Sequence, residues 1–138
     1  MTIPILVLLI FALWTLLTLF GSVGVYRWSR ILTGRVPIGE WRADEVQGDD
    51  WYRRAMRAHA NCVENLPVYT AIVVAILATG VTGEILDWAA IIMIVARVCQ
   101  TVSHIALTPS NCAAALRFTL FFVQAVCMIT MAIYVVLS

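Results

Sequence analysis

The chain has 138 residues, of which 62% are hydrophobic and only 12% are charged, whereas a soluble domain is roughly 45–50% apolar and about 25% charged. A chain of this length cannot hide so many apolar side chains in one core, so lipid must solvate much of the surface and a soluble fold is excluded. The formal net charge of +1 provides no broad basic field, which excludes DNA and RNA as partners. The composition therefore predicts an integral membrane protein.

Four apolar runs are long enough to cross a bilayer, which takes about 20 residues in a helix. The helices are expected at about 3–26, 51–79, 85–107 and 112–137. A long polar link occupies residues 27–50, and Pro109 with Ser110 or Asn111 marks the end of the third helix and the N-cap of the fourth. We therefore predict an all-α bundle of four transmembrane helices, with residues 1–138 as a single domain.

The distribution of charge predicts how this bundle lies in the membrane. Four arginines belong to the first link, namely Arg27, Arg30, Arg35 and Arg42. The link after the second helix offers only Glu84 and Asp87. By the positive-inside rule, the link 27–50 faces the cytoplasm and both termini lie on the opposite side of the membrane.

Polar side chains inside the spanning helices are the best candidates for function, because an ionisable group near mid-bilayer costs roughly 2.5–3.5 kcal/mol. Three helices carry such residues at spacings of three, four or seven, which place them on one helix face. These stripes are Arg57, Asn61 and Glu64 on the second helix, Arg97, Gln100, Thr101 and His104 on the third, and Arg117 with Gln124 on the fourth.

The first two stripes are expected to face one another, because their residue numbers run in opposite directions along antiparallel helices. The predicted neighbours are Glu64 with Arg97, Asn61 with Gln100 and Thr101, and Arg57 with His104. We predict a Glu64–Arg97 ion pair inside the bundle, which serves either to fix helix register or to bind a ligand.

Several guanidinium groups at the cytoplasmic mouth suit a small molecule that carries carboxylate or phosphate groups, since Arg grips such groups with two parallel hydrogen bonds. Arg53 and Arg54 serve either as headgroup anchors or as ligand contacts. The apolar flanks of the same cleft open to lipid, so a second, hydrophobic substrate can approach from the bilayer. The four cysteines form no CxxC pair, and no metal site is predicted.

The segment RAHANCVENLP, residues 57–67, resembles the signature of the MAPEG family, the membrane-associated proteins in eicosanoid and glutathione metabolism. The family pattern R-A-x-x-N-x-x-E, followed closely by Pro, is matched at Arg57, Asn61, Glu64 and Pro67. Four spans, a charged first link and Arg97 in the third helix extend the likeness over nearly the whole chain.

The resemblance implies a homotrimer that holds glutathione between adjacent subunits near the cytoplasmic face. It implies a glutathione transferase or peroxidase in which the thiol, activated as a thiolate, attacks or reduces a lipophilic electrophile. A nearby cation favours a thiolate over a thiol. The expected glutathione contacts are Arg53, Arg57, Asn61, Glu64, Arg97 and His104, and the expected catalytic residue is Arg117.

The chain departs from the family pattern at three places. His104 stands where well-known members have Tyr, and Ala60 stands where some have Arg. The family's Arg at the start of the fourth helix aligns with Ala113 or Ala114, and the nearest arginine is Arg117, nearly one helical turn further on. The alternative is therefore a non-catalytic, lipid-binding or scaffolding membrane protein.

Overall fold

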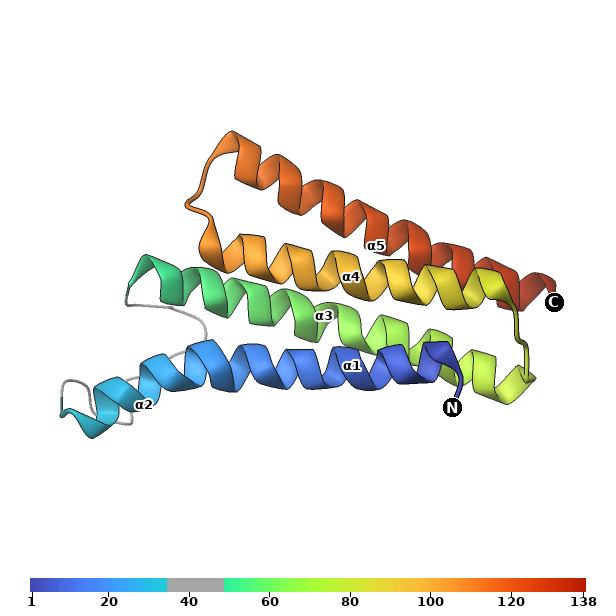
Figure 1. The fold of residues 1–138 in the computed structure, drawn as a ribbon, viewed down its shortest axis with the longest axis horizontal. Coiled ribbons are helices and arrows are strands. Elements are labelled where there is room, and N and C mark those ends of the chain that lie inside the picture. The colour runs from blue at the N-terminus through green and yellow to red at the C-terminus, as the bar shows by residue number, and fades with distance from the viewer. Residues whose placement is uncertain (35–48) are drawn as a thin grey trace.

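The computed structural model describes residues 1–34 and 49–138. All regular structure in these two ranges is helical (Figure 1), in the order α1 (Ile3–Thr18), η1 (Leu19–Gly24), α2 (Val25–Leu32), α3 (Asp50–Thr79), α4 (Glu84–Ala106) and α5 (Asn111–Leu137). Four helices are long and apolar enough to cross a membrane, the first of them running without a break through α1, η1 and α2. The predicted all-α fold with four spans is confirmed.

The first span is longer than the sequence predicts, because it ends at Leu32 and not near residue 26. Its middle part, η1, is π-helical, a geometry that occurs mostly as a single wide turn inside an α-helix. Arg27 and Arg30, which were expected in the link, lie on α2. The other two arginines of the link, Arg35 and Arg42, lie outside the described residues.

Local signals end and begin the other helices close to the predicted positions. Gly80 follows α3 with a left-handed φ of 67°, a conformation that glycine adopts without steric cost. At the start of α5, the Ser110 side chain accepts a hydrogen bond from the Ala113 amide nitrogen at 3.1 Å and so caps the helix. The two short links make α3, α4 and α5 successively antiparallel (Figure 1).

The helix α4 is the centre of the bundle, since it packs against α1, α3 and α5. Phe11, Tyr69 and Met93, from α1, α3 and α4, are completely buried in the main apolar core. Large apolar side chains on the outside are exposed, among them Leu13 and Trp88, as expected for a surface that lipid solvates. Figure 1 shows α5 diverging from α4 toward the α4–α5 turn.

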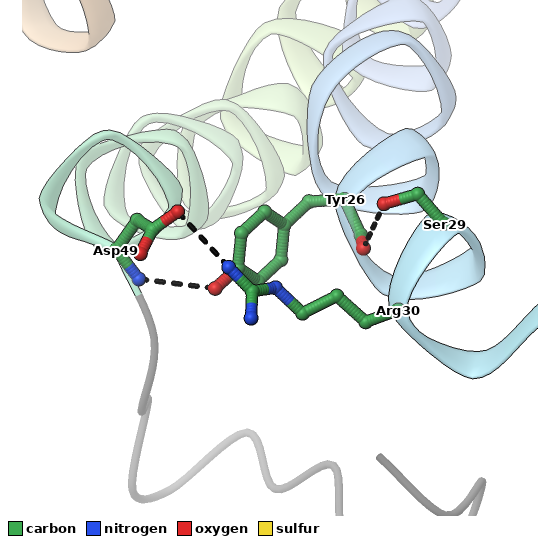
Figure 2. A network of polar contacts seen from close by, with 4 residues as sticks. All are labelled: Tyr26, Ser29, Arg30 and Asp49. Atoms are coloured by element: carbon green, nitrogen blue, oxygen red, sulfur yellow. Dashed lines mark hydrogen bonds and ion pairs between the residues drawn. The ribbon is translucent and has the colours of Figure 1, made fainter. Parts of the chain in front are cut away.

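A polar and aromatic network joins α2 to the start of α3 (Figure 2). The Arg30 guanidinium lies 3.2 Å from a carboxylate oxygen of Asp49, whose backbone N–H donates to the Tyr26 hydroxyl at 3.1 Å. The Ser29 hydroxyl donates to the Tyr26 carbonyl at 2.9 Å. The Tyr26 ring also stacks on Tyr52 with centroids 4.2 Å apart. These contacts fix the polar end of the bundle, where α2 ends and α3 begins.

Candidate functional site

An open groove with a volume of about 400 Å³ lies among α3, α4 and α5, near the α4–α5 turn. Its lining residues are Asn61, Glu64, Gln100, His104, Ala114, Arg117, Phe118 and Phe121. The groove therefore brings together four residues that the sequence singles out for a site, Asn61, Glu64, His104 and Arg117. Glu64 is the one acid in the lining that the structure describes.

Helical periodicity explains how each helix contributes to this lining. Asn61 and Glu64 are three residues apart on α3, and Gln100 and His104 are four apart on α4. Both spacings place two side chains on the same helix face, one turn apart. On α5, Arg117 follows Ala114 by three residues, so its side chain points to the same side of the helix. The residues of one stripe thus enter the groove together.

Two glutamines hold α4 against α5 at the level of Arg117. The Gln100 amide nitrogen donates to the backbone carbonyl of Arg117 at 3.3 Å. The amide of Gln124, which is completely buried, donates to the Gln100 side-chain oxygen at 2.8 Å and to the Leu120 carbonyl at 3.0 Å. These bonds fix the register of the two helices and bring Arg117 to the groove, although it lies one turn beyond the aligned alanines.

Positive charge gathers around His104. The imidazole is only 5% exposed, and neither ring nitrogen has a hydrogen-bond partner among residues 1–34 and 49–138. The guanidinium groups of Arg54, Arg57 and Arg117 all lie close enough to interact electrostatically with the ring. Arg54 also donates from Nε to the Ile105 carbonyl at 2.9 Å, which ties α3 to the last turn of α4.

Two arginines of α3 that the sequence singles out, Arg53 and Arg57, do not line the groove. Arg57 and Arg53 are both exposed to the outside of the bundle, and neither belongs to the lining. Arg57 lies within electrostatic reach of His104, so it stands near this part of the molecule. No comparable contact to Arg53 is found within the described part of the chain, residues 1–34 and 49–138.

The predicted ion pair between Glu64 and Arg97 is wrong. Arg97 is 1% exposed, and its guanidinium carbon lies over the Phe11 ring of α1, 5.6 Å from the centroid. Glu64 is exposed, and the ion pairs within the described ranges do not include it. Nε and Nη2 of Arg97 have no hydrogen-bond partner in the described part of the chain. Arg97 is therefore an interior residue and not part of the groove.

The packing of α3 explains this error. The face of α3 that enters the bundle carries the small residues Ala55, Ala58 and Cys62, each at most 1% exposed, and small side chains let two helices approach closely. Cys62, and not Asn61, therefore meets Thr101, with the sulfur 3.6 Å from the hydroxyl oxygen. Because each residue turns an α-helix by about 100°, Glu64 points to nearly the opposite side from Cys62.

Two aromatic residues of the lining are not distinguished by the sequence. Phe118 and Phe121 on α5 are 72% and 41% exposed, and they form the apolar side of the groove beside Arg117. In a chain so rich in apolar residues, only a four-residue spacing marks them, that of Phe118 from Ala114 and of Phe121 from Arg117. Among the residues that the structure describes, no group of three His, Cys, Asp or Glu is placed to hold a metal ion.

Comparison with known proteins gives one match. A family model described as MAPEG family matches residues 5–137, which include all but the first two residues of α1 and the whole of α3, α4 and α5. No curated protein and no solved structure matches the chain. The match extends far beyond the segment RAHANCVENLP and covers every helix that contributes to the groove.

Proposed function

The chain belongs to the MAPEG family, a membrane family associated with glutathione transferase and peroxidase chemistry, and we propose that it is itself a membrane-bound, glutathione-dependent enzyme. Its substrates are lipophilic electrophiles, and the reaction is a transfer to, or a reduction of, the electrophile. The observation that carries this proposal is the groove, in which Asn61, Glu64 and His104 lie together with Arg117.

The polar groups of the groove match those of the tripeptide. Glutathione carries two carboxylates, an ammonium group, two peptide bonds and a thiol. Glu64 is the acid available for the ammonium group, and the Asn61 amide offers hydrogen bonds to a peptide bond. Arg57 and Arg53, which are exposed near the same end of α3, suit the carboxylates. Arg97 is enclosed in the bundle, so the proposal gives it no contact.

The catalytic role falls to Arg117. Ionisation of the bound thiol breaks the S–H bond, leaves the electron pair on sulfur and releases the proton to water. A guanidinium group beside the sulfur favours the thiolate, which is the reactive nucleophile. In the transfer reaction the thiolate forms a C–S bond as the leaving group departs. Phe118 and Phe121 offer the apolar surface on which an electrophile arriving from the bilayer can rest.

The open side of the groove supports a shared site. Among residues 1–34 and 49–138, the groove has walls from α3, α4 and α5 alone, and an adjacent subunit of a homotrimer would cover it. Native mass spectrometry or cross-linking in detergent tests the assembly. The expected species is a trimer, and a monomer that binds glutathione with undiminished affinity would contradict a site between subunits.

The proposed orientation places this groove at the cytoplasmic face. Arg27, Arg30 and Arg54 gather at the groove end of the bundle, whereas Glu84 and Asp87 lie in the first turn of α4 at the other end. The positive-inside rule then directs the groove end inward. A protease-sensitive tag at either terminus of the chain in sealed vesicles should be cleaved only from the non-cytoplasmic side.

Thiolate absorbance in the ultraviolet tests the proposed activity most simply. Purified protein should give a saturable thiolate signal on titration with glutathione, and Arg117→Ala should lose it while Arg117→Lys retains part of it. Arg30→Ala, an arginine on α2 outside the groove, is the matched control and should keep the full signal. Absence of glutathione binding to folded protein at millimolar concentration would favour the lipid-binding or scaffolding alternative.

A further inference from the structure

His104 differs from the other groove residues because its ring is buried and yet forms no hydrogen bond within the part of the chain that the structure describes. Its exposed fraction is 5%, and both ring nitrogens are without a hydrogen bond among the described residues. Buried polar groups in proteins are nearly always hydrogen-bonded. His104 lines the groove, and both nitrogens are covered by protein atoms, so a turn of the side chain about its χ angles would present an N–H to a molecule bound there.

The register of α4 and α5 shows which part of the groove lies next to the ring. Gln100 contacts the backbone of Arg117, and the helices are antiparallel. One turn further along α4, at His104, the facing position is therefore one turn earlier on α5, at Ala113 and Ala114. Ala114 lines the groove together with His104 and Arg117, and a methyl side chain takes up little of the groove.

We propose, on the basis of the proposed function, that His104 contacts the sulfur of bound glutathione and donates a hydrogen bond to the thiolate. Imidazole carries a hydrogen on at least one ring nitrogen in each of its protonation states, so a donor is always present. A hydrogen bond to a charged acceptor is shorter and stronger than one to a neutral acceptor. His104 therefore stabilises the thiolate more than the thiol.

The charges around the ring give His104 and Arg117 different roles in stabilising the thiolate. Three guanidinium groups act on the ring, those of Arg54 and Arg57 from α3 and that of Arg117 from α5, and Glu64 of α3 lines the same groove. Arg117 supplies the positive charge, and His104 supplies a directed N–H. The thiol proton goes to water, and the electron pair of the S–H bond stays on sulfur.

The test measures the pH midpoint of thiolate formation by glutathione bound to the full protein in detergent. His104→Leu removes the donor and should raise this midpoint by roughly one to two pH units, as expected for a hydrogen bond to a charged group. His104→Gln keeps an N–H donor and should shift the midpoint by less than half as much. His104→Phe is a second donor-free variant if the leucine variant does not fold.

Thr101→Val is the matched control, since Thr101 is a buried polar residue one turn earlier on α4 that does not line the groove. It should leave the midpoint unchanged. S-methylglutathione, which has no ionisable thiol, should bind the donor-free variants with wild-type affinity, whereas glutathione above the wild-type midpoint should bind them about tenfold more weakly or worse, the change that corresponds to one pH unit.

An unchanged midpoint in the donor-free variants would overturn the role of His104 and leave the proposed function intact. Equal shifts in His104→Gln and His104→Leu, or equal losses of affinity for both ligands, would assign His104 a structural role and also overturn it. If wild-type protein forms no glutathione thiolate, the proposed function fails, and the role of His104 fails with it.

Discussion

Arg97 and His104 lie seven residues apart on one face of α4, and both are almost completely buried. Both carry polar atoms that have no hydrogen-bond partner among the residues that the structure describes. Their surroundings differ. Arg97 faces the Phe11 ring in the interior of the bundle, whereas His104 lines a groove to which Arg117 also contributes. The comparison shows that burial of a polar side chain does not by itself make a site. The residues that face the buried side chain decide whether a ligand has room beside it.

The largest expected effect is on turnover at the groove. Arg117→Ala should lower kcat/KM with glutathione and a chlorodinitrobenzene by about 100- to 1000-fold, the range for loss of a group that stabilises developing negative charge. Its thermal midpoint should stay close to that of the wild type, because Arg117 is only partly buried. Steady-state kinetics and a thermal melt check both parts. A variant that retains wild-type turnover would remove Arg117 from the mechanism.

Arg97 should respond in the opposite way. Arg97→Met keeps much of the side-chain volume and removes a buried charge that has no acidic partner among the described residues. A buried charge without an ionic partner is costly because it loses its hydration, so its removal should raise the free energy of unfolding by about 1–2 kcal/mol. Denaturation in mixed detergent measures it. A loss of several kcal/mol would mean that a partner of Arg97 lies outside the described contacts.

The smallest expected effect concerns the predicted Glu64–Arg97 ion pair, which is not formed among the described residues. Glu64→Leu and Arg97→Met should change stability independently, with a coupling energy below about 0.5 kcal/mol, as for residues that share no contact. Unfolding of the two single variants and the double variant gives this coupling. A stabilising coupling of several kcal/mol would restore the direct pair and contradict the rotation of α3 described above.

The sequence predicts the four spans well because each has a local cause. Long apolar runs require a lipid environment, Gly80 ends α3 in a left-handed conformation, and Ser110 caps α5. The extension of the first span to Leu32 is not predicted. In the sequence, the two arginines of α2 look like residues of a polar link. The contacts that accompany the helix there are tertiary, such as the ion pair of Arg30 with Asp49, and a local sequence pattern does not show them.

The site is predicted only in part, for a similar reason. Spacing along each helix identifies which residues share a face, and this places Asn61 with Glu64 correctly. Spacing does not determine how far each helix is rotated about its axis. The small face at Ala58 and Cys62 sets that rotation for α3 and separates Glu64 from Arg97. The amide contacts of Gln100 and Gln124, which bring Arg117 to the groove, are likewise visible only in the folded chain.

A crystal or cryo-electron-microscopy structure of the protein soaked with S-hexylglutathione would show whether the groove binds the tripeptide. We expect the tripeptide in the groove, with its sulfur beside Arg117 and His104, its ammonium group near Glu64, and Arg97 out of contact. Tripeptide density against Arg97, or at a place remote from Arg117, would contradict this expectation.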